Sequence, residues 1–140
     1  MRVIPLPYRF QLGQTKLLPL CDVHVLGPRG RTRVPAVFDS GAFEPMFHVG
    51  VADDAGISLT RSAHVTVQYG GSTTSGRRIR VHIELEHHRL DTEIIFVEQL
   101  VLPYGLLGRR TIFSQFNEVV FLEKVVPTEG GASLVRGSRR

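Results

Sequence analysis

One aspartate directly follows an apolar segment and is followed by residues that favour a tight, exposed turn. The segment reads Val37-Phe38-Asp39-Ser40-Gly41-Ala42. Gly41 permits a sharp turn or the close approach of another chain, and the Ser40 hydroxyl can hydrogen-bond to nearby backbone. The pattern predicts a carboxylate at the end of a strand, where it is accessible for acid–base chemistry. The same three residues also form ordinary turns, so a turn aspartate is the alternative interpretation.

A second glycine-containing element lies much further along the chain. It reads Pro103-Tyr104-Gly105-Leu106-Leu107-Gly108-Arg109. A short helix is expected after it, at Arg109–Gln115, and then an apolar strand at Glu118–Leu122. Between the two elements, residues 70–76 (Gly-Gly-Ser-Thr-Thr-Ser-Gly) predict the polar tip of a hairpin.

Most of the chain alternates apolar and polar residues, as strands with one solvated face do. The clearest case is Arg78–Glu86, and Ala63–Tyr69 is its expected hairpin partner. Further strands are expected at Leu20–Leu26, Thr32–Phe38 and Thr92–Val97. Helical patterns are short: Val49–Ala55, ending at Gly56, and Arg109–Gln115. Strands at these spacings predict an all-β barrel or sandwich with one or two short helices.

The Asp-Ser-Gly-Ala loop, the glycine-rich hairpin and the Leu-Leu-Gly-Arg element occur in an order that resembles the retropepsins. These are single-domain aspartic proteases of retroviral type with bacterial relatives, and the resemblance covers about Leu20–Leu122. It implies a closed acid-protease barrel that forms a homodimer. It also implies aspartic endopeptidase activity on a peptide or protein substrate, with no metal or cofactor.

The resemblance assigns a role to each motif residue. Asp39 matches the catalytic aspartate, Ser40 the residue that braces the loop against the partner chain, and Gly41 and Ala42 the positions beside the bound peptide. The flap, a hairpin that closes over substrate, is matched by the glycines 70 and 71, and Tyr69 precedes it as a substrate contact or a strand aromatic. Structural support for the loop is matched by Leu107, Gly108 and Arg109, with Glu44 as the expected partner of that arginine.

The mechanism that the resemblance implies uses one Asp39 from each of two subunits. Two full charges about 3 Å apart repel by roughly 5–6 kcal/mol at an effective dielectric constant of 20, so one carboxyl group stays protonated. The ionised carboxylate takes a proton from water, which attacks the peptide carbonyl, and the protonated partner donates to the carbonyl oxygen. The alternative is an inactive barrel of the same fold that acts as a protein-interaction or dimerisation module.

The chain has 140 residues, which suffices for one domain but is too short for a two-lobed enzyme in a single chain. We expect an N-terminal extension at 1–19, the protease-like domain at 20–126 and a disordered basic tail at 127–140. The net charge is +4, and the tail carries much of the excess through arginines 136, 139 and 140. Specific nucleic-acid binding is therefore not expected. Without a signal peptide or membrane-span pattern, the expected location is cytoplasmic.

Other chemistries fit the sequence less well. Residues 71–76 have the G-x-x-x-x-G spacing of a phosphate loop, but Arg77 and Arg78 follow instead of Lys and Ser or Thr. A single cysteine, Cys21, and histidines without H-x-x-x-H spacing leave no zinc motif. No G-x-S-x-G sequence supports a serine hydrolase.

Overall fold

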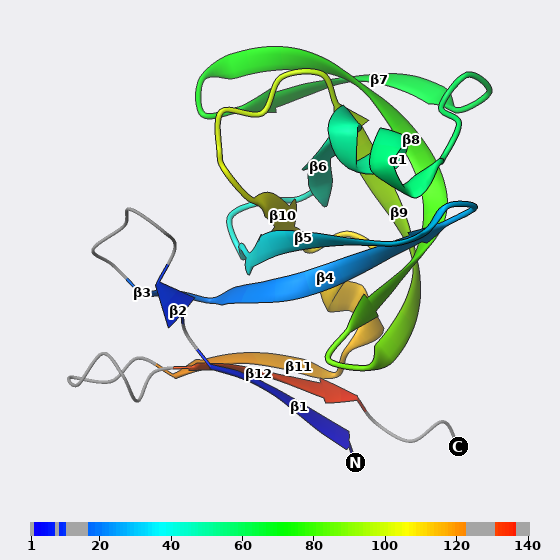
Figure 1. Ribbon diagram of the computed structural model, residues 1–140. Helices are drawn as coiled ribbons and strands as arrows, with labels where there is room; N and C mark the ends of the chain where they lie inside the picture. Colours follow the sequence, from blue (N-terminus) through cyan, green and yellow to red (C-terminus); the bar gives the residue numbers. More distant parts are fainter. Residues whose placement is uncertain (1, 8, 11–16, 123–130, 137–140) are drawn as a thin grey trace.

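A seven-stranded sheet curls into a barrel and forms the body of the molecule (Figure 1). The structure is a computed structural model that describes residues 2–7, 9–10, 17–122 and 131–136. Six strands close a ring in the order β4-β5-β10-β6-β9-β8, and β8 pairs back with β4. The ring strands are β4 (Leu20–Gly27), β5 (Gly30–Phe38), β6 (Met46–His48), β8 (Ser72–Leu85), β9 (His88–Val97) and β10 (Gly105–Leu107). The expected all-β barrel is therefore confirmed.

The alternating residues of the long strands supply the barrel core. In β8, the side chains of Val81, Ile83 and Leu85 are buried, while His82 between them is exposed. The β9 strand contributes Ile94 and Phe96 from the other side, both with 0% exposure. Burying side chains of this size from several strands is the main source of barrel stability.

Strand β7 (Ala63–Tyr69) lies outside the closed ring and pairs only with β8 among the described strands. Its hairpin turn is shorter than the sequence predicts. Only Gly70 and Gly71 form it, with φ values of 54° and 76°, and β8 already begins at Ser72. Two consecutive residues with positive φ match the twist of a two-residue hairpin. The expected polar tip is wrong for residues 72–76, because Thr74 and Gly76 are buried in the sheet.

The expected helix α1 (Val49–Ala55) is present with the predicted bounds. The Gly50 N–H donates to His48 Nδ1 at 3.0 Å and thereby caps the helix start, while Gly56 ends the helix with φ 73°. Ala52 and Ala55 are buried against the barrel. The second expected helix, Arg109–Gln115, is reduced to a single 3₁₀ turn, η1 (Phe113–Gln115).

Thr111 explains why that second helix does not form. It has φ 62°, which a right-handed helix excludes, and its hydroxyl donates to the Glu93 carbonyl at 2.9 Å. Buried Thr92 in turn donates to the Thr111 hydroxyl at 2.7 Å. Contacts with β9 therefore override the helical pattern of this segment.

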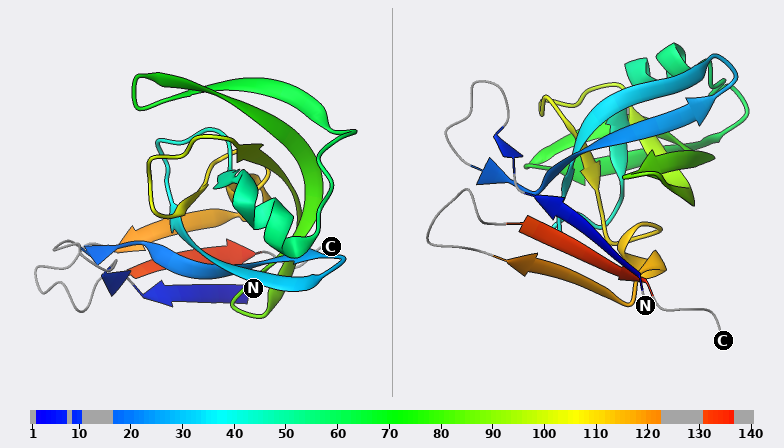
Figure 2. Two further views of the ribbon diagram at one scale, coloured as in Figure 1. Left: turned by 45° about the horizontal axis from the view of Figure 1, so that its top comes forward. Right: turned by 60° about the horizontal axis from the view of Figure 1, so that its bottom comes forward.

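A three-stranded sheet joins the two ends of the chain beside the barrel, as Figures 1 and 2 show. Its order is β1 (Arg2–Pro7), β12 (Gly131–Arg136) and β11 (Glu118–Leu122), all antiparallel. A short pair, β2 (Arg9–Phe10) and β3 (Leu17–Leu18), leads from β1 into the barrel. The expectation of a disordered tail is thus wrong for Gly131–Arg136, while residues 127–130 and 137–140 lie outside the described residues. The tail composition concealed the run Ala132-Ser133-Leu134-Val135, which has the pattern of a short strand.

None of the helices in the described part of the chain is long and apolar enough to cross a membrane.

The central position of β12 leads to a stability prediction. Truncation after Val126 removes β12 and leaves β1 and β11 without their shared partner. We expect a loss of about 2–5 kcal/mol in the free energy of unfolding, because buried Ile4 on β1 loses the strand that holds it in place. Chemical denaturation measures this change.

Truncation after Arg136 is the matched control, because it removes the same end of the chain and keeps β12. It should unfold at nearly the denaturant concentration of the full chain. If both truncations unfold like the full chain, β12 contributes nothing to stability.

Candidate functional site

The Asp39 carboxylate lies just beyond the end of β5 and is oriented by its own loop. Phe38, the last residue of β5, is buried, whereas Asp39 is partly exposed and Ser40 and Gly41 are exposed. The Gly41 N–H donates to Asp39 Oδ1 at 2.8 Å, and the Ala42 N–H donates to the Asp39 carbonyl at 3.1 Å. The loop therefore fixes the direction of the carboxylate while leaving it accessible.

The Leu107–Arg109 segment runs directly beside this loop. Strand β10 pairs in parallel with β5, so that Leu107 is the register partner of Phe38. The Asp39 N–H donates to the Leu107 carbonyl at 3.1 Å, and the Arg109 N–H donates to the Ala42 carbonyl at 3.0 Å. Backbone hydrogen bonds thus hold the loop before and after its turn.

Gly108 is required for this close packing. A Cβ atom at this position would lie 2.7 Å from the backbone carbon and oxygen of Glu44. Gly41 is tight as well, because a Cβ atom there would lie 3.1 Å from Asp39 Oδ1. Gly108 therefore allows a backbone approach that a side chain would prevent, and a side chain at Gly41 would crowd the Asp39 carboxylate.

The hairpin of β7 and β8 extends over the same end of the barrel as the Asp39 loop. Figures 1 and 2 show its tip on the side where the β5–β6 connection and the long β9–β10 connection also lie. A Cβ atom on either Gly70 or Gly71 would meet nothing within 4 Å, so the tip is surrounded by open space. Tyr69 pairs with Ser72 at the base of the turn, and its side chain lies outside what the structure describes.

An apolar cluster connects the hairpin to the Asp39 loop. Four of its residues are buried and six are partly buried. The partly buried members come from the loop itself, from β7 and from the β9–β10 connection. The cluster comprises Met46, Ile95, Val97 and Leu106, with Ala42, Val65, Val67, Leu100, Leu102 and Tyr104 packed against them. The surface beside the carboxylate is therefore suited to apolar groups of a ligand.

Glu44, the expected partner of Arg109, has other partners in the structure. Its carboxylate lies 2.8 Å from Arg78 and 3.4 Å from Arg110. Glu93 joins the same two arginines, at 3.8 Å from Arg78 and 3.2 Å from Arg110. Within the described residues Arg109 makes no ion pair with Glu44, and the expected pairing is wrong.

Arg109 instead lies over an exposed aromatic ring. Its guanidinium carbon is 5.6 Å from the centre of the Phe43 ring, and 59% of Phe43 is exposed. The next residue, Arg110, reaches the Glu44 carboxylate instead, and its N–H donates to the Phe43 carbonyl at 2.8 Å.

Arg78, Arg110 and Glu93 also lie at the site, although no sequence motif points to them. These residues form an ion-pair network with Glu44, which follows the Asp39 loop. The alternation of β8 placed Arg78 correctly on a polar face, but the sequence carries no signal for which strand lies opposite. The network tethers the loop to β8, the strand that continues into the hairpin.

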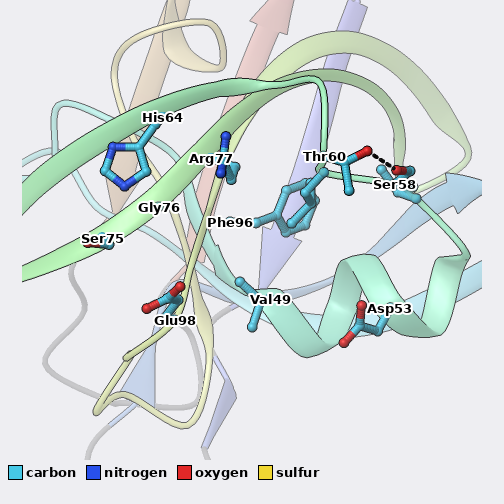
Figure 3. Close-up of a pocket in the computed structure, with 12 residues that line it drawn as sticks. Val49, Asp53, Ser58, Thr60, His64, Ser75, Gly76, Arg77, Phe96 and Glu98 are labelled. Atoms are coloured by element: carbon cyan, nitrogen blue, oxygen red, sulfur yellow. Dashed lines mark hydrogen bonds between the residues drawn. The ribbon is translucent and has the colours of Figure 1, made fainter.

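A pocket lies elsewhere in the molecule. It has a volume of about 580 Å³ and is bounded by α1, residues 57–60, β7, β8 and the end of β9 (Figure 3). Among the described residues that line it, none belongs to the predicted site. Among the described residues, no three side chains of His, Cys, Asp or Glu lie together in a way that could hold a metal ion.

No protein-family model matches this chain, and no curated protein is significantly similar to it in sequence.

The contact at Gly108 leads to a prediction for the loop. We expect Gly108→Ala to lower the free energy of unfolding by about 1–3 kcal/mol, because the added methyl group meets Glu44 backbone that cannot move aside without shifting the loop. Chemical denaturation measures the loss, and the amide NMR signals of residues 39–44 should shift. Ser114→Ala, an exposed change nearby, is the control. Wild-type stability for Gly108→Ala would contradict the described packing.

The ion-pair network leads to a second prediction. Glu44→Gln replaces the charged partner of Arg78 and Arg110 by a neutral amide. The Glu44 side chain is only 18% exposed, so water compensates little for the lost ion pairs. We expect a loss of about 1–3 kcal/mol in the free energy of unfolding.

Asp91→Asn is the matched control for that change. Asp91 pairs with Arg80 at 3.2 Å, and the two side chains are 51% and 62% exposed. A surface pair of this kind contributes about 1 kcal/mol or less. Equal losses for the two variants would mean that the Glu44 network stabilises the fold no more than a surface pair does.

Proposed function

We propose that this protein is a homodimeric aspartic endopeptidase of retropepsin type. The observation that carries the proposal is the Asp39 loop: a partly exposed carboxylate that accepts a hydrogen bond from the Gly41 N–H and is held from behind by Leu107. A carboxylate fixed by backbone donors needs no reorganisation when charge develops in a reaction. The loop sequence and the order of the motifs agree with this function.

In the proposed mechanism, two copies of the chain bring their Asp39 carboxylates together, because one chain supplies a single such loop. Two adjacent carboxylates share one proton, since the repulsion of two full charges is large at short distance. The ionised carboxylate removes a proton from water, and the oxygen of that water attacks the peptide carbonyl carbon. The protonated carboxyl group donates its proton to the carbonyl oxygen, and collapse of the tetrahedral intermediate breaks the C–N bond as the amine leaves with a proton.

The substrate class follows from the surroundings of the loop. The hairpin tip at Gly70 and Gly71 is open on its surface and acts as the flap over an extended peptide. The partly buried side chains of Ala42, Val65 and Val67 favour an apolar side chain on the substrate beside the scissile bond. An extended peptide would also use its own backbone groups in hydrogen bonds, as an added strand does.

The central prediction concerns Asp39→Asn. We expect this variant to cleave a peptide library at least about 10²–10⁴-fold more slowly than the wild type, because an amide can neither accept the proton from water nor supply one. Mass spectrometry of the library, scanned from about pH 3 to about pH 8, measures cleavage over the range in which carboxyl groups gain and lose protons. Asp54→Asn, at an exposed position on α1, is the control and should cleave like the wild type.

Two outcomes would overturn the proposal. Equal cleavage by wild type and Asp39→Asn would assign the activity to another site or to a contaminant. A protein that sediments as a dimer and cleaves nothing would instead be an inactive barrel that serves protein interaction or dimerisation.

A further inference from the structure

The pocket behind the hairpin is separate from the Asp39 loop and has the size of a ligand site. Its volume of about 580 Å³ lies within the range of roughly 300–1,000 Å³ that is usual for small-molecule pockets. Helix α1 and residues 57–60 form one wall, and His64 of β7 with residues 75–77 of β8 forms the other. A ligand here would lie between the helix and the base of the hairpin.

The floor of the pocket is apolar. Phe96 is completely buried in the protein core, and Val49, Ile57 and Leu59 are partly buried around it. Gly76 lines the pocket without a side chain, and a Cβ atom there would lie 2.8 Å from the Ile95 side chain. The floor therefore favours apolar groups of a ligand.

Charged side chains lie on two opposite sides of this floor. In Figure 3, His64 and Arg77 lie in the upper part of the view, and the carboxylates of Glu98 and Asp53 lie in the lower part with Val49 between them. The pocket thus has a side rich in nitrogen donors and a side with two acids.

These charged groups have bonding capacity to spare. Within the described residues, the side chains of His64, Glu98 and Asp53 take part in no hydrogen bond or ion pair. Arg77 uses one nitrogen to donate to the Ser62 carbonyl at 3.1 Å, and a guanidinium group has five N–H donors. By contrast, Glu44 of the β5–β6 connection and Glu93 of β9 are both paired with arginines.

Hydroxyl groups complete the lining. Ser58 and Thr60 hydrogen-bond to each other at 3.0 Å, and Ser75 lies exposed on β8. A hydroxyl group both donates and accepts, which suits the N–H and C=O groups of a peptide bond. A peptide with free ends combines amide groups, an apolar body and opposite charges at its two ends, and so matches these features of the lining.

We propose that this pocket binds a short apolar peptide with free ends, a dipeptide or tripeptide. Its ammonium group lies toward Glu98 and Asp53, its carboxylate toward Arg77 and His64, and its side chains on the Phe96 floor. The pairing satisfies charges at both ends of the ligand, and charged hydrogen bonds are the strong ones. The proposal does not depend on Asp39, because the pocket shares no residue with that loop.

Isothermal titration calorimetry with the dipeptide Leu-Leu tests the proposal. We expect saturable binding of one Leu-Leu per chain. Leu-Leu with an acetylated amino end, and Leu-Leu with an amidated carboxyl end, should each bind at least about tenfold more weakly, because each loses one charged contact. Leu-Leu with both ends blocked binding as tightly as free Leu-Leu, or no binding of Leu-Leu at millimolar concentration, would overturn the proposal.

Variants assign the binding to the pocket. Glu98→Gln and Asp53→Asn should each weaken the binding of Leu-Leu several-fold, and together at least about tenfold. Glu86→Gln, in the exposed turn between β8 and β9, and Asp39→Asn should leave it unchanged. Loss of binding in Asp39→Asn with retention in the double variant would place the ligand at the Asp39 loop and refute this inference. Retention of binding in Asp39→Asn supports it whether or not the protein cleaves peptides.

Discussion

The parallel pairing of β5 with the three residues of β10 is the interaction on which both the barrel and the Asp39 loop depend. Strand β10 fills the space between β5 and β6, so the ring closes only when it is present. All three of its residues are buried. The strand fits because Gly105 has no side chain, since a Cβ atom there would overlap the Phe47 ring at 2.0 Å. The same short strand closes the fold and presents the Leu107 carbonyl to the Asp39 N–H.

A second layer of contacts connects the loop to the hairpin. Arg78 reaches Glu44 from β8, and the apolar cluster brings β7 residues against Ala42. The loop region therefore contacts the hairpin strands in two ways, through the ion pair of Glu44 with Arg78 and through the apolar packing of Ala42. Arg78 Nε is buried and has no hydrogen-bond partner within the described structure, so this network is not fully satisfied. Buried polar groups without partners cost free energy, which suggests that specificity of position, rather than stability, accounts for the network.

The sequence predicted the elements that have strong local signals. The alternation in Arg78–Glu86, the helix Val49–Ala55 and the strand Glu118–Leu122 all correspond closely to the structure, because each depends on its own residues. The Asp39 loop and the Leu107-Gly108 segment could also be singled out from the types of residue they contain. Their position next to each other could be expected only from the resemblance to the retropepsins, because neither segment alone predicts the pairing of β5 with β10.

Features that depend on contacts between distant segments could not be predicted from the sequence. The Thr111 hydroxyl donates to the Glu93 carbonyl of β9, and Arg110, rather than Arg109, is a partner of Glu44 in the described structure. Neither contact can be read from the sequence of one segment. The pocket lining comes from five separate parts of the chain, and its two charged sides exist only after folding. A strand in the C-terminal segment was overlooked because glycine, serine and arginine around it dominate the composition.

The place of β12 between β1 and β11 sets the order in which the two sheets can form during translation. Every ring strand of the barrel lies before residue 108, so all of them leave the ribosome before residues 131–136 do. During translation, β1 therefore waits without a partner while the barrel strands are already available to pair. Contacts between the two ends of a chain are the slowest to form by diffusion, and an unpaired strand edge is prone to wrong associations. The three-stranded sheet is thus the last part of the fold to be completed and the part most exposed to error during synthesis.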